Sequence, residues 1–207
     1  SAIIDVQSRN INLTPFYELL QNQKVLKVFH AARQDLEIFF NEKKIFPKPF
    51  FDTQVAAMVC GFGDQVGYET LVKKLVLVSI DKSSRFTNWS QRPLSDRQLN
   101  YAISDVTYLR SVYEELQRML EENKRSEWLE EELAILLDPK TYDSNPENAW
   151  KKVKTRNNNF IFLSFVKSLA RFREKLAQSR NVPRNRILRD DMIIELASIK
   201  PRSLVEL

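Results

Sequence analysis

Apolar and polar residues follow two different periods along the chain, and these periods predict its secondary structure. Short apolar runs at residues 2–6 and 25–30 are typical of strands, and Phe51-Asp52 predicts a third, brief strand end. The strands at 2–6 and 25–30 are expected to pair in parallel, because a helix lies between them. The helical periods place helices from about Thr14 (with Pro15 at the first helical position), over 33–41, 53–60, 71–78 and from 95 to about 123.

The helix predicted from residue 95 carries an apolar stripe and two polar residues that the stripe does not explain. Ser95 as N-cap and Gln98 three residues later form the pattern of a capping box. Tyr101 and Asp105 lie one turn apart on one face of this helix. A surface hydrogen bond between them is the ordinary interpretation. The alternative is a metal-binding carboxylate next to a phenol that positions a water molecule. The stripe itself consists of Leu99, Ala102, Ile103, Val106 and Leu109.

After residue 137 the pattern changes from mixed α/β to helical. Residues 138–158 contain two prolines in a polar run and are predicted to be a linker. Helices are expected over about 159–178 and 189–198, and another after Pro201. The predicted organisation is therefore an α/β domain over 1–137 and an all-α domain over 159–207.

Charge separates the same two parts. Residues 151–207 contain 14 Lys or Arg against 5 Asp or Glu, a net of +9, and the preceding residues contain 18 against 22, a net of −4. The basic part is a candidate for contact with a nucleic-acid backbone, and the alternative is an ordinary solvated surface. Arg184, Arg186 and Arg189 form its best candidate patch.

Composition excludes several classes of protein. One cysteine rules out a disulfide framework and a multi-thiolate zinc site, and three glycines argue against a glycine-rich phosphate loop. No apolar run approaches the length of a membrane span, so we expect a soluble, cytoplasmic protein without a membrane partner.

Further candidate residues lie outside the 95–123 helix. His30, at a strand end, and Asp35, in the first turn of a helix, are both expected near the carboxyl edge of the sheet, where α/β folds bind ligands. For His30 the favoured interpretation is a hydrogen-bonded structural residue, and the alternative is substrate contact. Asp52 is expected to cap the following helix. In the polar loop 80–93, Lys82 and Arg85 are candidates for substrate phosphates, against a merely solvated loop.

Two groups of aromatic residues have a second interpretation as stacking surfaces for single-stranded nucleic acid. Phe46, Phe50 and Phe51 are interleaved with lysines, but packing in the core is favoured for all three. For Phe86 and Trp89, anchoring of the 80–93 loop to the core is favoured over stacking on bases.

Several blocks together resemble the ribonuclease D family of 3′–5′ exonucleases, within the superfamily named for four acidic residues and a tyrosine. The blocks are FHAARQDLEIFF, FDTQVAAMVCGFG, GYETLVKKL, IDKSSRFTNWSQRPLSDRQLNYAISDVTYL, ENAWKKVK and NVPRNRILRDD. The resemblance covers essentially the whole chain. It implies an α/β fold, a ribonuclease H-like exonuclease domain, followed by an all-α HRDC domain. Asp35 matches the second acidic motif of the family, and Tyr101 and Asp105 match the third.

The resemblance also implies a mechanism. Asp35 and Asp105 would be ligands of two divalent ions, Mg²⁺ or Mn²⁺, and Tyr101 would position the attacking water. The partner would be RNA, with transfer RNA precursors as the usual substrates, and the protein is expected to be a monomer. Two alternatives stay open: a DNA exonuclease of the same superfamily, and a catalytically inactive RNA-binding scaffold.

One feature of the family is missing from the sequence. Members carry a first acidic motif, Asp-x-Glu, on the first strand, and Asp5 does not match it because Gln7 stands where the glutamate would be. The HRDC-like part also ends before a helical bundle is complete. We therefore expect the chain to be a fragment that lacks the exonuclease domain's N-terminal strands and is inactive alone.

Overall fold

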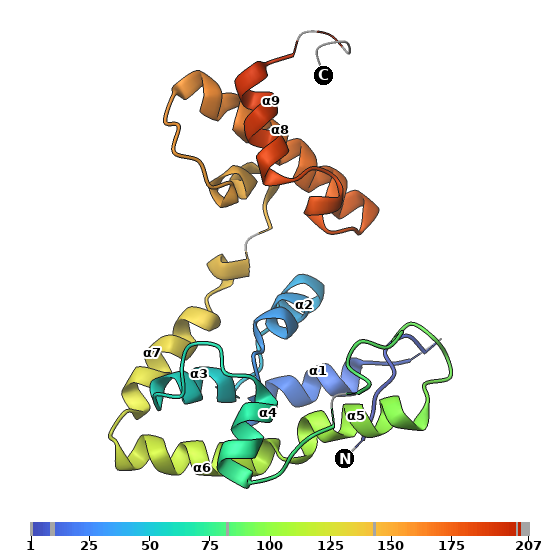
Figure 1. Cartoon of the computed structure of the whole chain (residues 1–207), viewed down its shortest axis with the longest axis vertical. Coiled ribbons are helices and arrows are strands. Elements are labelled where there is room, and N and C mark those ends of the chain that lie inside the picture. Colours follow the sequence, from blue (N-terminus) through green and yellow to red (C-terminus); the bar gives the residue numbers. More distant parts are fainter. Residues whose placement is uncertain (1, 9–10, 82, 143, 202, 204–207) are drawn as a thin grey trace. The chain divides into compact units, whose positions relative to one another are not determined.

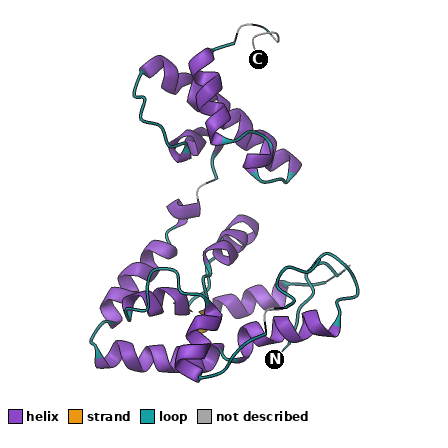
Figure 2. Cartoon of the chain, viewed as in Figure 1, coloured by secondary structure: helices purple, strands orange, loops and turns teal. Residues whose placement is uncertain are grey.

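The computed structural model describes residues 2–8, 11–81, 83–142, 144–201 and 203 (Figure 1). The chain divides into two compact units, residues 1–142 and 143–207. The division falls inside the predicted linker, and the exact domain boundaries stay predictions. Helices dominate both units, and the strands are short (Figure 2).

The first unit contains two strands and a series of helices. Its strands are β1 (Lys27–Phe29) and β2 (Phe50–Asp52). Its helices are α1 (Thr14–Gln21), α2 (Arg33–Lys43), α3 (Thr53–Val59), α4 (Tyr68–Leu71), the π-helical turn η1 (Val72–Val76), α5 (Asp96–Thr107), α6 (Leu109–Glu122), α7 (Ser126–Leu136) and the 3-10 turn η2 (Pro139–Tyr142).

The two strands pair in parallel, with Lys27 opposite Phe50 and Phe29 opposite Asp52. The strand predicted over residues 2–6 is wrong, because those residues do not pair with a strand in the described part of the chain. A strand needs a hydrogen-bonded neighbour, which an apolar run cannot supply by itself. Ile3 and Ile4 are accordingly exposed rather than buried.

The core of the first unit forms where α6 packs against α3, β1 and η1. Val112, Leu116 and Leu120 recur every four residues along α6 and are fully or almost fully buried. Helix α7 also packs against α3 and buries Leu129 and Leu133. The helical periods had not predicted α7 as a separate element.

The single helix predicted from 95 to about 123 is two helices, because Tyr68 interrupts the hydrogen-bond ladder at Tyr108. The Tyr108 backbone N–H donates to the Tyr68 hydroxyl at 3.2 Å, and that hydroxyl donates to the Ser104 carbonyl at 3.4 Å. The phenol thus takes the place of the N–H to C=O bond that would have joined α5 to α6. The predicted capping box at the start of α5 is confirmed, with Ser95 and Gln98 bonded reciprocally.

The second unit is entirely helical in its described residues. It contains the 3-10 helix η3 (Pro146–Lys152), α8 (Phe160–Arg180), the 3-10 turn η4 (Arg184–Arg186) and α9 (Asp190–Ile199). Both η3 and α9 pack against α8. Arg173 of α8 is fully buried, and its Nη1 donates to the Leu188 carbonyl at 3.1 Å and to Asp190 at 2.6 Å. The helix predicted after Pro201 lies outside the described residues.

Across both units, we find no described helix with the length and apolarity needed to span a bilayer.

Candidate active site

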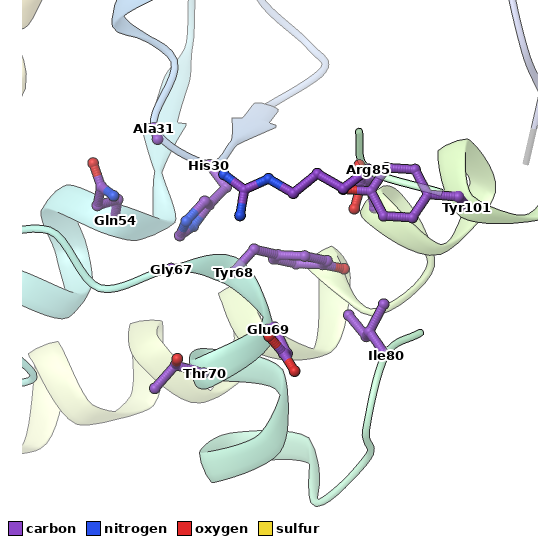
Figure 3. A pocket seen from close by; sticks show the side chains of 11 residues that line it. His30, Ala31, Gln54, Gly67, Tyr68, Glu69, Thr70, Ile80, Arg85 and Tyr101 are labelled. Atoms are coloured by element: carbon purple, nitrogen blue, oxygen red, sulfur yellow. The ribbon is translucent and has the colours of Figure 1, made fainter. Parts of the chain in front are cut away.

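A pocket of about 420 Å³ brings together residues from five separate segments of the first unit, one of which is α3 with Gln54 (Figure 3). His30 follows β1, Tyr68 begins α4, Arg85 belongs to the 80–93 loop, and Tyr101 and Asp105 belong to α5. Four of these five residues are sequence-predicted candidates. The fifth, Tyr68, was missed, although it lies in the block GYETLVKKL.

Tyr101 and Asp105 interact directly inside this pocket. Partial desolvation raises the pKa of Asp105 above its ordinary value, and a hydrogen bond from Tyr101 and the charge of Arg85 partly oppose this shift. Desolvation and the Asp105 charge also raise the pKa of Tyr101. At neutral pH Tyr101 is therefore a protonated phenol that can donate a hydrogen bond to the carboxylate or to a water molecule.

Arg85 provides the positive charge of the pocket. Figure 3 shows its side chain extending from the Tyr101 side of the pocket towards His30. Its backbone carbonyl accepts a hydrogen bond from the Trp89 indole at 3.3 Å, and the Trp89 ring packs on Tyr101 with ring centroids 5.8 Å apart. A guanidinium placed beside a carboxylate and a phenol suits an anionic substrate such as a phosphodiester.

The loop that carries Arg85 is held by an ion pair between Arg92 and Asp5. The Arg92 Nε and Nη2 each donate to an Asp5 carboxylate oxygen at 2.7 Å, and Nη1 donates to the Trp89 carbonyl at 2.8 Å. The hydrogen bond from Arg92 lowers the pKa of Asp5 from its ordinary 3.8. The ion pair therefore contributes fully above pH 3.8 and is lost as the pH falls through the lower pKa of the folded state.

We expect Arg92→Gln to raise the pKa of Asp5 towards its ordinary value of 3.8, because the largest cause of the shift is removed. An NMR titration of the Asp5 carboxyl carbon measures this change. Arg110→Gln is the matched control, because Arg110 pairs with Glu114 on the surface of α6 and makes no contact with Asp5 in the described residues. An Asp5 pKa that is unchanged by Arg92→Gln would show that the pair does not form in solution.

Asp52, the last residue of β2, fixes two helix starts at once. Its buried carboxylate accepts from the backbone N–H groups of Gln54 and Val55 in α3, which confirms its predicted role as an N-cap. It also accepts from Ala31 at 3.1 Å and Ala32 at 2.8 Å, directly before α2. Ala31 is in the left-handed region with φ 57°, a conformation that costs a non-glycine residue about 1 kcal/mol. Asp52 therefore stabilises the sharp turn that leads from β1 into α2.

His30 lines the pocket but is also tied to the fold. Its Nδ1 lies 2.9 Å from the Thr53 hydroxyl, which in turn donates to the Phe29 carbonyl at 3.0 Å. Its ring packs on Tyr68 with centroids 5.6 Å apart. Burial lowers the pKa of His30, so the imidazole is neutral at pH 7. These contacts give His30 a structural role, and its contact with substrate stays a prediction.

Asp35 is exposed in the first turn of α2 and is not among the residues that line the pocket. Desolvation raises its pKa, and the negative charge of Asp52 adds to the shift. Among the described residues, no three His, Cys, Asp or Glu side chains lie close enough together to hold a metal ion. The structure thus brings Tyr101, Asp105, Arg85 and His30 together, but it does not join Asp35 to that set.

The remaining predicted residues lie elsewhere. Lys82 falls outside the described residues. In the second unit, Arg184 and Arg186 are in η4, and Arg186 is exposed. Arg189 precedes α9 and pairs with Asp191 at 2.8 Å, so part of its charge is compensated.

Two family models match the chain, one in each unit. A model described as 3′–5′ exonuclease matches residues 1–121, and a model described as HRDC domain matches residues 162–207. The ribonuclease D of Jannaschia sp. (strain CCS1) is 56% identical over 207 residues, which are 100% of this chain and 54% of that protein. The chain therefore spans about half the length of this relative.

Two solved structures also match the chain, and one of them is a ribonuclease D. The crystal structure of Escherichia coli RNase D, described as an exoribonuclease involved in structured RNA processing, matches with a TM-score of 0.84 and 29% identity, over 95% of this chain and 52% of that one. Brucella melitensis NrnC with bound Mg²⁺ matches with a TM-score of 0.55 and 27% identity, over 70% of this chain and 69% of that one. The fold is thus that of a ribonuclease H-like exonuclease domain followed by an HRDC domain, and the chain belongs to the 3′–5′ exonuclease family, among its ribonuclease D members.

Proposed function

We propose that the full-length product of this gene is a 3′–5′ exoribonuclease that removes nucleotides from RNA 3′ ends, with transfer RNA precursors among its substrates. The observation that carries the proposal is the Tyr101–Asp105 pair, which lines one pocket together with Arg85. A guanidinium can bind the phosphate, a phenol can position the attacking water and a carboxylate can bind a cation, so these groups are suited to metal-assisted phosphodiester hydrolysis. The ribonuclease D name of the similar proteins supports this choice of reaction.

We further propose that Asp105 and Asp35 hold a divalent cation, Mg²⁺ or Mn²⁺, with two ions in the complete site. Carboxylate oxygens are the ligands that these ions prefer, and NrnC of similar fold was solved with bound Mg²⁺. The described residues contain no group of three His, Cys, Asp or Glu side chains that could hold a metal ion, so the proposal names these two carboxylates alone. When bound, the cations supply charge neutralisation at the phosphate and an acidified water molecule.

The residues of this chain have separate roles in that scheme. Arg85 binds a phosphate oxygen and orients the terminal nucleotide. Tyr101 is held in place by Trp89 and Asp105. Its hydroxyl forms a hydrogen bond with the attacking water and so orients that water towards the phosphorus atom. Asp52 acts indirectly, by fixing the start of α2 and with it Asp35. We propose a cytoplasmic monomer as the working form.

Shortening of oligonucleotides tests the reaction. The full-length gene product is incubated with Mg²⁺ or Mn²⁺ and with RNA and DNA of one sequence, each labelled at the 5′ end. The proposal predicts a ladder of 5′-labelled products from RNA. Shortening of DNA in preference to RNA would instead support a DNA exonuclease, and RNA binding without shortening would support a scaffold.

The basic surface of the second unit gives a separate prediction. Replacing Arg184 and Arg186 together by Gln is expected to weaken RNA binding at low salt. It should also reduce the slope of log affinity against log salt by about one for each phosphate that the variant no longer neutralises. Fluorescence anisotropy with a labelled single-stranded RNA measures both effects. Arg118→Gln is the control, since Arg118 is paired on the surface of α6 with Glu115 and Glu122. Equal salt slopes for the double variant and the wild type would contradict the prediction.

A further inference from the structure

Phe86 is 91% exposed, although it lies in a loop where it was expected to pack onto the core. That expectation is wrong for Phe86, because the ring makes almost no contact that excludes water. A fully solvated phenylalanine forgoes the stabilisation that burial of its side chain would give. Single exposed apolar side chains are ordinary on protein surfaces, so a role for Phe86 depends on the residues beside it.

The backbone on both sides of Phe86 is held in place. Ser84 is buried, and its carbonyl accepts from the Thr87 hydroxyl at 2.7 Å and from the Thr87 N–H at 3.3 Å. The Gln98 side chain then donates to the Thr87 hydroxyl at 3.1 Å, which ties the turn to α5. Phe86 is thus presented on a turn fixed by hydrogen bonds, so little order has to be gained when a ligand binds to the ring.

Phe86 is also next to a residue of the candidate active site, both in sequence and in space. The guanidinium carbon of Arg85 is 5.2 Å from the centroid of the Phe86 ring, and Arg85 itself lines the pocket with Asp105. A cation near the ring and an open ring surface next to a candidate hydrolytic site suit a ligand that has both a phosphate and a flat aromatic part.

We propose that Phe86 stacks on an unpaired nucleobase near the 3′ end of the RNA while Arg85 contacts a neighbouring phosphate. This inference rests on the proposed function, because it assumes a single-stranded nucleic acid in the pocket. Stacking on a phenyl ring is tolerant of sequence, since every base has a flat aromatic face. Phe86 would therefore add affinity for an unpaired 3′ end and select against an end held in a duplex.

The test measures binding with and without the base. The full-length gene product carries Asp105→Asn in every sample, so that RNA is bound but not shortened. Anisotropy is measured with 5′-labelled single-stranded RNA, either intact or with one abasic site placed in turn at each position near the 3′ end. Phe86→Ala is expected to weaken binding of the intact RNA about five- to hundred-fold. With the abasic site at the stacked position, wild-type Phe86 and Phe86→Ala should bind equally.

Two further variants separate stacking from general hydrophobicity. Phe86→Trp should retain the affinity and Phe86→Leu should lose most of it, because leucine is apolar but has no flat ring. Phe160→Ala is the matched control, since Phe160 of the second unit is 85% exposed, and its effect should not depend on any abasic site.

The outcomes distinguish the two proposals. If the protein with Phe86 intact does not bind the RNA, the proposed function fails and the stacking role fails with it. If that protein binds and Phe86→Ala binds equally well, or if the weaker binding persists with every abasic RNA, the stacking role alone is overturned.

Discussion

Replacing Asp105 by Asn is expected to lower the rate of RNA shortening by the full-length gene product by more than about a hundredfold. The change keeps the shape of the side chain but removes its negative charge. Changes to groups that merely support a metal ligand already cost about ten- to hundred-fold in metal affinity or activity, so the loss of a ligand itself should cost more. The rate is measured on 5′-labelled RNA at saturating Mg²⁺ and again with Mn²⁺.

The matched control is Asp96→Asn on the same helix. Asp96 is exposed in the first turn of α5 and does not line the pocket, so its change should leave the rate nearly unaltered. RNA affinity is measured in parallel, because the loss of a residue that binds RNA directly would weaken RNA binding. The loss of a metal ligand would lower the rate of shortening instead. If Asp105→Asn retains most of the activity, Asp105 is not part of the catalytic site.

Replacing Asp52 by Ala is expected to lower the free energy of unfolding by about 2–4 kcal/mol. One lost N-cap costs about 0.5–2 kcal/mol, and here one carboxylate serves the starts of both α2 and α3. Buried backbone N–H groups that lose their acceptor add a desolvation cost. Urea denaturation of the 207-residue chain, followed by far-UV circular dichroism, measures the change.

Asp52→Asn should lose less stability than Asp52→Ala, because the amide oxygen can still accept hydrogen bonds from the backbone N–H groups at the start of one of the two helices. Asp96→Ala again serves as the control, and a surface change of this kind should stay within about 0.5 kcal/mol. If Asp52→Ala is as stable as that control, the hydrogen bonds that the Asp52 carboxylate accepts contribute nothing in solution.

Local signals in the sequence predicted the parts of the fold that depend on neighbouring residues. The Ser95–Gln98 capping box, the proline in the first turn of α1 and the Asp52 cap are all formed by residues within a few positions of each other. Such contacts follow directly from spacing. The sequence also predicted that Tyr101 and Asp105 share a helix face, and the structure places both in one pocket.

Features that depend on distant residues were not predictable in the same way. The break between α5 and α6 arises from Tyr68, which lies 40 residues before Tyr108 in the chain. The second role of Asp52, at the start of α2, needs Ala31 and Ala32 from another strand connection. Phe86 was predicted to pack onto the core because large aromatic side chains are usually buried. In the structure it is exposed on the turn that the hydrogen bonds of Ser84 and Gln98 hold.

The family motif and the pocket place Asp35 differently. The family motif assigns it to the same centre as Asp105, whereas the pocket contains only Asp105 of the two. A crystal of the full-length gene product soaked in Mn²⁺, with an anomalous difference map, locates the cation directly. We predict a Mn²⁺ ion bound by carboxylate oxygens of both Asp35 and Asp105. A map in which the ion binds elsewhere, or contacts neither of these residues, would contradict the proposed mechanism.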